Sequence, residues 1–372
     1  MSPRMSRFPL LVPAMFAVAT VSAAEVVSAS PGIELTPTGA SNAEAAAKAP
    51  TAPDPRAFVF EGAPADFSDG AYAATVEAML AAYERDTART LKPGKLGKVA
   101  LKLYTASGPG LSTPKALTDA VVAAMQRRGF TRGNILLVDQ QEKTLREAGY
   151  LPVVRDEKVT DYKGSPVLAL DTGKYFDTKP DTKWTYPECK LPSKEFQPAP
   201  EDFEYKADAR DTLSHLPMPL LFGVDFWINL PMACDNATLG VSGALANATL
   251  LNVGNARRFW DNPANAQKAV VEIAAIPELK EKMELTILPL EKYQFVGGPK
   301  FDAAFTVSEK RIWLSANPVI LDYLMWKRFN DNRVKMKFDP ISPEPGMFLS
   351  ANSGDIRLGS CRPSDLRLVQ VK

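Results

Sequence analysis

The connection that reads Ser107-Gly108-Pro109-Gly110-Leu111-Ser112-Thr113-Pro114-Lys115 has residue types that suit anion binding. Glycines let backbone amides approach a ligand, and the amino end of the helix expected next favours negative charge. Ser112, Thr113 and Lys115 would add two hydroxyls and an ammonium group. The spacing matches neither G-x-x-x-x-G-K-[ST] nor G-x-G-x-x-G. An ordinary turn with Thr113 as the helix cap is the alternative, and the Ser112-x-x-Lys115 spacing lacks the K-T-G companion of a serine–lysine nucleophile.

The single histidine, His215, restricts metal and hydrolase chemistry. Zinc and iron sites built on several imidazoles cannot form within a chain that has one. A Ser-His-Asp triad would have to use His215. The run Gly240-Val241-Ser242-Gly243-Ala244 departs from the nucleophile elbow at its last position, where glycine is required. Multi-histidine metal sites are therefore not expected, whereas metal binding through oxygen ligands stays open.

Four stretches resemble one known family. They read Val99-Ala100-Leu101-Lys102, Asp225-Phe226-Trp227-Ile228-Asn229-Leu230-Pro231, Gly240-Val241-Ser242-Gly243-Ala244-Leu245-Ala246-Asn247 and Ser315-Ala316-Asn317-Pro318-Val319-Ile320-Leu321-Asp322. They are similar to the core of the domain-of-unknown-function-362 family, whose pattern is roughly D-[VI]-x-I-N-[LV]-P-K-x-K-x-H, then G-[VI]-T-x-x-[LM]-K-N, then S-x-D-P-V-A-x-D. The resemblance spans about residues 97–330. It implies binding roles for the retained residues Lys102, Asp225, Asn247 and Asp322.

The chain also departs from that pattern. Met232-Ala233-Cys234-Asp235-Asn236 replaces the segment with two lysines and a histidine, and Ala246 stands in place of a further lysine. An anion in the resulting pocket would depend on Lys102, Asn236, Asn247, Arg257 and Arg258. A solvated approach to a helix is the alternative interpretation of the two arginines. Some family members hold ferredoxin-type iron–sulfur clusters, for which three widely spaced cysteines do not suffice.

The elements that must position these residues alternate along the chain. Hydrophobic spacing predicts helices over 69–89, 114–128, 263–276 and 318–329, and strands over 99–104, 134–139, 224–230, 285–290 and 311–314. The tail, 338–372, is expected to form short strands and turns. Residues 172–213 show no period and are expected to form a long irregular insertion. This order predicts an α/β fold, a three-layer sandwich with a mostly parallel sheet.

The first 24 residues are typical of a secretory signal peptide. Arg4 and Arg7 precede an apolar run from Phe8 to Ala19, and small residues follow at 21–23. A cytosolic amphipathic helix is the alternative. The general secretory route is favoured because no Arg-Arg pair precedes the apolar run. Residues 25–56, rich in Ala, Pro, Ser and Thr, are expected to be a flexible tether, and 57–372 the α/β domain. The protein is thus expected to be periplasmic or secreted.

Export would place Cys189, Cys234 and Cys361 in an oxidising compartment. An odd number of cysteines permits at most one internal disulfide and leaves a thiol over. The spacing does not choose among the three pairings. Cys234 is the cysteine expected to be free.

The charge balance excludes wholesale nucleic-acid binding, because 44 basic and 43 acidic residues leave a net charge of +1. We expect a small anionic metabolite to bind, or react, in a cleft at the carboxyl ends of the strands, where the 105–115 and 232–258 loops should emerge. No membrane span is expected after signal cleavage. Two alternatives are a non-catalytic extracytoplasmic binding or scaffold protein, and a carbohydrate-active enzyme using Asp225 and Asp322 as paired carboxylates. The sequence indicates no reaction, cofactor or protein partner.

The leader carries the first testable prediction. The exported protein should have the mass of a chain that begins at Glu25, because cleavage follows the small residues at the end of the leader. Replacing Leu10 and Leu11 by Asp should keep the full-length chain inside the cell, since charge interrupts the apolar run. Intact-mass spectrometry of fractionated cells checks both. An extracytoplasmic chain that still begins at Met1 would contradict the cleavage.

Overall fold

The computed structural model describes residues 52–154, 158–172, 214, 216–260, 263–354 and 356–372. The chain divides after Pro50 into two units, and all of these residues belong to the second. The predictions for the leader, most of the tether, nearly all of the 172–213 insertion, Cys189 and His215 lie outside the described residues.

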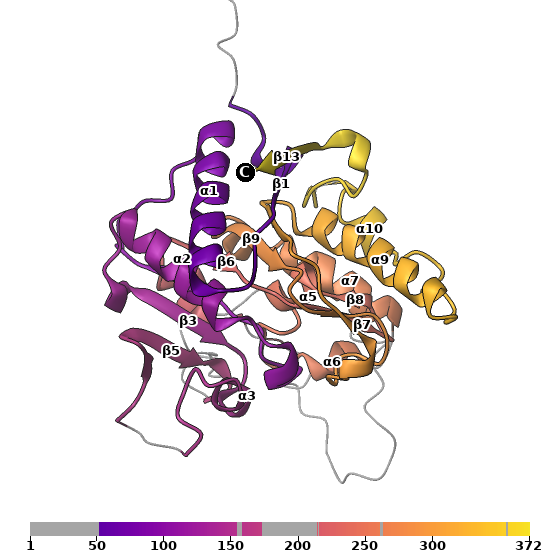
Figure 1. The fold of residues 1–372 in the computed structure, drawn as a ribbon, viewed down its shortest axis with the longest axis horizontal. Helices are drawn as coiled ribbons and strands as arrows, with labels where there is room; N and C mark the ends of the chain where they lie inside the picture. Colours follow the sequence, from indigo (N-terminus) through magenta and orange to yellow (C-terminus); the bar gives the residue numbers. More distant parts are fainter. Residues whose placement is uncertain (1–51, 155–157, 173–213, 215, 261–262, 355) are drawn as a thin grey trace, which may run out of the picture. The chain divides into compact units, whose positions relative to one another are not determined.

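A nine-stranded sheet is the centre of the structure, with the strand order β13-β1-β12-β9-β6-β2-β3-β5-β4 (Figure 1). Its strands are β1 (Phe58–Gly62), β2 (Val99–Lys102), β3 (Ile135–Asp139), β4 (Asp161–Tyr162), β5 (Ser165–Ala169), β6 (Phe226–Asn229), β9 (Met283–Pro289), β12 (Ile312–Ser315) and β13 (Arg367–Val371). The run from β9 through β6, β2 and β3 to β5 is parallel throughout. β12 and β4 are antiparallel to their neighbours. The predicted mostly parallel α/β sheet is confirmed.

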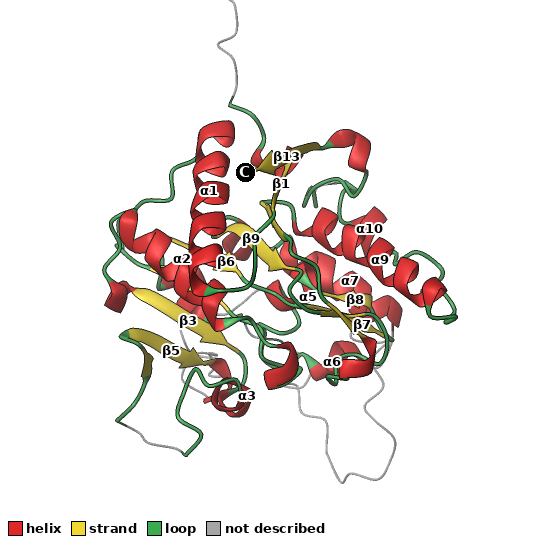
Figure 2. Cartoon of the chain, in the orientation of Figure 1, coloured by secondary structure: helices red, strands yellow, loops and turns green. Residues whose placement is uncertain are grey.

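Helices cover both faces of this sheet (Figure 2). They are α1 (Asp69–Thr87), α2 (Lys115–Arg127), α3 (Glu142–Glu147), α4 (Met218–Phe222), α5 (Ala244–Ala248), α6 (Arg257–Trp260), α7 (Pro263–Ala274), α8 (Pro277–Lys280), α9 (Pro318–Lys335) and α10 (Met347–Ser350). Side chains alternate along a strand, so Val99 and Leu101 pack with α1 and α2, whereas Ala100 packs with α5, α7 and α9. Lys102 has the same parity as Ala100, and its side chain therefore belongs to the α5 layer.

The long helices begin where the sequence predicts because their caps are local. Ser68 accepts a hydrogen bond from the Ala71 amide at the start of α1. Asn317 accepts hydrogen bonds from the Val319 and Ile320 amides at the start of α9, and proline follows it in the first turn. Such caps depend on residues within one turn, and they can be recognised without the tertiary structure.

Short elements were missed by the sequence analysis. A second sheet, in the order β11-β10-β7-β8, consists of β7 (Ala233–Asn236), β8 (Gly240–Ser242), β10 (Tyr293–Gln294) and β11 (Thr306–Val307). These strands are too short to show a period of two, and the pairing of β7 with the distant β10 joins them into one sheet. The same holds for β1, which lies between β12 and β13, two strands far away in sequence.

The strand order reverses direction at β2. From β2 the chain proceeds to β3 and β5 on one side, then returns to the other side of β2 to form β6 and β9. In open α/β sheets, the crevice at the carboxyl ends of the strands beside such a switch point is the usual ligand position. Here it lies at the carboxyl ends of β2 and β6, next to Lys102 and Asn229.

Candidate functional site

A buried ammonium group lies at the switch point. The side chain of Lys102 is fully buried, and its Nζ donates hydrogen bonds to Asp139 Oδ1 at 2.7 Å, Leu103 O at 2.8 Å and Asn247 Oδ1 at 3.0 Å. Three acceptors match the three hydrogens of an ammonium group. Burial lowers the pKa of Lys102, and the carboxylate of Asp139 opposes that shift. The crevice where a ligand would be expected is thus filled by the protein's own polar side chains.

The Asp139 carboxylate is shared among several donors. Besides Lys102, Asp139 Oδ1 accepts a hydrogen bond from the Gln140 amide at 2.7 Å, and Asp139 Oδ2 accepts one from Thr105 Oγ1 at 2.5 Å. Thr105 Oγ1 also lies 2.7 Å from Thr144 Oγ1 in α3. The ion pair therefore ties the end of β3 to the loop after β2, and it holds the backbone at Gln140.

Asn247 is oriented by a second buried amide. Its Nδ2 donates to Asn229 Oδ1 at 2.8 Å, which leaves Asn247 Oδ1 facing Lys102. Asn229 Nδ2 in turn donates to Ala244 O at 2.8 Å and Thr286 Oγ1 at 3.3 Å. The amides thus link β6 and β9 to the short helix α5.

Asp322 holds the amino end of α5. Its two carboxyl oxygens accept hydrogen bonds from the Ala244 amide at 2.6 Å and the Leu245 amide at 2.9 Å. A side chain at Gly243 would collide with this carboxyl group, since a Cβ there would lie 2.3 Å from Asp322 Oδ1. Burial raises the pKa of Asp322 to about 7, although the two amide hydrogen bonds oppose the shift. Asp322 is therefore a positioning residue for the helix that carries Asn247.

The Ser107–Lys115 connection is an ordinary turn between a strand and a helix. Ser112 Oγ donates to Gly108 O, and Thr113 Oγ1 donates to Leu230 O and accepts from the Tyr104 amide. A Cβ at Gly110 would lie 2.1 Å from a carbon of the Phe301 ring, so this glycine permits packing against a side chain. Lys115 is exposed. The helix begins at Lys115 with Pro114 as its cap, and not with Thr113.

Two further candidates stabilise turns. Asp225 lies at the amino end of β6, and its carboxylate accepts hydrogen bonds from the Gly94, Leu96 and Lys98 amides. Partial burial raises the pKa of Asp225, but the hydrogen bonds from these amides outweigh that effect and hold the pKa below its usual value. Asn236 Oδ1 accepts from the Thr238 and Leu239 amides between β7 and β8.

The four residues retained from the motifs therefore lie in two different parts of the structure. Lys102, Asn247 and Asp322 join one buried network, whereas Asp225 lies at the opposite edge of the sheet. Asp225 and Asp322 do not face a common groove, because Asp322 is fully buried. This pair does not have the arrangement that carbohydrate-active enzymes require.

The cysteines Cys234 and Cys361 are buried free thiols, as expected for Cys234. Burial raises the pKa of Cys234 to about 12, so its thiolate is strongly disfavoured. The Cys234 Sγ lies 3.7 Å from Tyr104 Oη, within an apolar cluster that includes Leu111 and Met232. Cys234 thus packs the core above the switch point.

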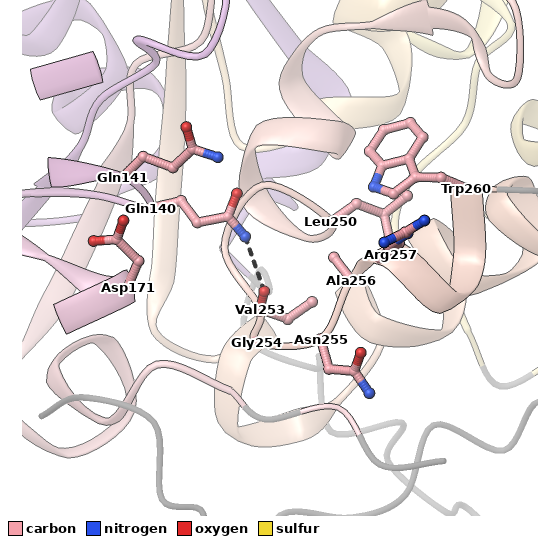
Figure 3. Close-up of a pocket in the computed structure, with 10 residues that line it drawn as sticks. All are labelled: Gln140, Gln141, Asp171, Leu250, Val253, Gly254, Asn255, Ala256, Arg257 and Trp260. Carbon is pink, nitrogen blue, oxygen red and sulfur yellow. Dashed lines mark hydrogen bonds between the residues drawn. The ribbon is translucent and has the colours of Figure 1, made fainter. Parts of the chain in front are cut away.

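A cavity of about 450 Å³ lies one strand further along the sheet, beyond the carboxyl ends of β3 and β5 (Figure 3). Its volume is within the range of small-molecule sites, roughly 300–1,000 Å³. Three segments line it: the turn after β3, the turn after β5, and the α5–α6 connection with α6. The lining residues are Gln140, Gln141, Asp171, Leu250, Val253, Gly254, Asn255, Ala256, Arg257 and Trp260.

The polar groups of this pocket are unevenly distributed. Figure 3 shows Gln140, Gln141 and Asp171 on one side, and Arg257 and Trp260 on the other. Gln140 Nε2 donates to Val253 O at 3.0 Å, and so it connects the two sides. Partial burial and the neighbouring Glu142 raise the pKa of Asp171 above its usual value.

Among the predicted candidates whose side chains are described, Arg257 is the one that lines this pocket. The side chain of Arg258 is not described. The expected convergence of Lys102, Asn236, Asn247, Arg257 and Asp322 on one pocket is not observed. Gln140, Gln141, Asp171 and Trp260 were missed. Gln140 and Gln141 directly follow the predicted strand 134–139, and polar residues after a buried parallel strand were a usable signal.

Comparisons with protein-family models, curated proteins and solved structures find no match to this chain. The resemblance to the domain-of-unknown-function-362 family stays a prediction from the motifs. Within the described ranges, no group of three or more His, Cys, Asp or Glu side chains is arranged to hold a metal ion. No helix in the same ranges is both long and apolar enough to cross a bilayer.

Replacing Lys102 tests the buried ion pair. Lys102→Met should lower the free energy of unfolding by about 3–5 kcal/mol, because it leaves the Asp139 carboxylate buried without its counter-ion. The double variant Lys102→Met/Asp139→Asn should recover part of that loss. Lys115→Met, at an exposed site, is the matched control and should change little. Urea denaturation checks all three, and a loss below about 1 kcal/mol for Lys102→Met would contradict the assignment.

Asp322 gives a prediction for the pH dependence of stability. Its pKa is about 7 in the folded chain against an ordinary 3.8, so the folded state binds the proton more tightly. This tighter proton binding stabilises the folded state by up to about 4 kcal/mol. The contribution is complete below about pH 4 and is lost as the pH rises through 7. The stability advantage of the natural chain over Asp322→Asn should shrink across that window. Urea denaturation from pH 4 to pH 8 measures it.

Asp225→Asn is the control, because its effect on stability should change with pH in the opposite direction. The pKa of Asp225 is lowered in the folded chain, so its contribution is lost as the pH falls. A difference between the natural chain and Asp322→Asn that does not vary with pH would refute the role given to Asp322.

Proposed function

We propose that this is an exported protein that binds, or acts on, a small anionic metabolite in the pocket beyond the carboxyl ends of β3 and β5. The observation that carries the proposal is Arg257, which lines a pocket of ligand size. Within the described part of the chain, no carboxylate lies within ion-pair distance of Arg257. An exposed guanidinium beside a cavity is well suited to bind a carboxylate or phosphate, with two parallel hydrogen bonds.

The remaining lining groups supply what a small organic anion needs. Trp260 offers apolar surface for its carbon skeleton, and the side-chain amide of Gln141 offers a donor and an acceptor. Most small-molecule sites have this composition, in which a few polar groups orient a ligand against apolar walls.

The buried network around Lys102 holds one wall of this pocket in place. Asp139 holds the Gln140 amide, and Lys102 holds Asp139, so the wall formed by the turn after β3 is fixed by a desolvated ion pair. Lys102 is then a positioning residue whose ammonium does not contact the ligand. Such rigidity reduces the entropy lost when a ligand binds.

Arg257→Gln tests the proposal. A panel of short monocarboxylates and monophosphates should include binders, and Arg257→Gln should weaken them at least tenfold, about 1.4 kcal/mol, because the charge-assisted hydrogen bonds are lost. Isothermal titration calorimetry measures the affinities. Arg362→Gln, at an exposed arginine outside the pocket, is the matched control and should bind like the natural chain.

Two outcomes would overturn the proposal: no anion of the panel binds, or binding is indifferent to Arg257→Gln. Product analysis of the mixtures with bound anions separates the two forms of the proposal. Unchanged anions would favour a non-catalytic binding protein, and chemical turnover would favour an enzyme.

A further inference from the structure

The pocket carries charges of opposite sign on its two sides. Asp171 follows β5 and lies with Gln140 and Gln141, while Arg257 begins α6 and lies with Trp260 on the opposite side (Figure 3). Neither side chain forms an ion pair with another described residue. A cation and an anion that line one cavity without pairing are both available to a ligand.

We infer that the ligand is zwitterionic, with a carboxylate or phosphate at Arg257 and an ammonium group at Asp171. The inference rests on the proposed function and names its ligand class. The pocket lining is largely apolar, and the partly exposed Trp260 offers a surface for the body that separates the two charges. A short ω-amino acid or an amino-alkyl phosphate has this distribution of charge.

Asp171 is built to receive a cation. Its Oδ1 accepts a hydrogen bond from the Glu142 amide at 3.1 Å, which orients the carboxyl group at the amino end of α3. Its Oδ2 has no protein partner among the described residues, and the side chain is exposed to the cavity. An ammonium group would supply the missing donor and keep the carboxyl group ionised.

An uncharged or purely anionic ligand would leave Asp171 unpaired. A purely anionic ligand would also bring a further negative charge towards the Asp171 carboxylate, which already interacts with the negative charge of Glu142. Binding a zwitterion replaces that repulsion by attraction, so the pocket should discriminate in its favour.

Three probes with one five-carbon skeleton test the inference: 5-aminopentanoate, pentanoate and pentan-1-amine. The first carries both charges, the second carries the carboxylate alone, and the third carries the ammonium alone. Calorimetry on the full mature chain should show the amino acid binding at least fivefold more tightly than the acid. Glycine, β-alanine and O-phosphoethanolamine, paired with acetate, propanoate and ethyl phosphate, extend the comparison to smaller bodies.

Asp171→Asn should remove the preference for the zwitterion, because it weakens binding of the amino acid without weakening binding of the acid. The Asn side chain keeps an acceptor for the Glu142 amide, and Asp171→Ser provides a second variant if Asp171→Asn folds poorly. Asp331→Asn, at an exposed aspartate of α9, is the matched control and should retain the preference.

The outcomes separate the two proposals. If anions bind through Arg257 but every matched pair binds equally, or Asp171→Asn weakens acid and amino acid alike, the zwitterion inference fails and the anion site stands. If no probe binds, or Arg257→Gln changes nothing, both fail.

Discussion

The burial of one ammonium group is the constraint on which the rest of this structure depends. Lys102 ends β2 inside the protein, and a desolvated charge must find acceptors for each of its hydrogens. Asp139 from β3, Asn247 from α5 and the adjoining backbone supply them. Asn247 is placed by Asn229, and α5 is held at its amino end by Asp322. One charge thus couples the parallel strands to the helical layer above them.

This coupling explains where the cavity lies. The switch point beside β2 is the ordinary ligand position in such sheets, yet Lys102 and its partners occupy it. The available space lies beyond β3 and β5 instead, and the residues there are attached to the same network through Asp139 and the Gln140 amide. The polar core therefore acts as a support for a neighbouring pocket, so a motif can be conspicuous in the sequence without touching a ligand.

Several features could be predicted because their causes are local. The periodic apolar faces of α1, α2 and α9, the Asn317 cap and the βαβ order all depend on residues close in the chain. Lys102, Asn247 and Asp322 were selected together from their motifs; Lys102 and Asn247 form a hydrogen bond, and Asp322 holds the helix that carries Asn247. Their role differs from the expected one, since spacing carries no information on whether a charged group faces a ligand or the interior. β7, β8, β10 and β11 were missed because they are short and because the pairing that joins them, between β7 and β10, links distant segments.

By itself, the sequence determined the class of the fold, the order of its principal strands and helices, and the exclusion of chemistry that needs several histidines. Only the tertiary structure decided which polar residues are buried and which line a cavity. Gln140, Asp171 and Arg257 are far apart in the chain, and they come together because β3 and β5 are neighbours and α5 is anchored above them. The physical reason is that secondary structure follows from side-chain periodicity within a segment, whereas a pocket follows from the packing of segments against one another.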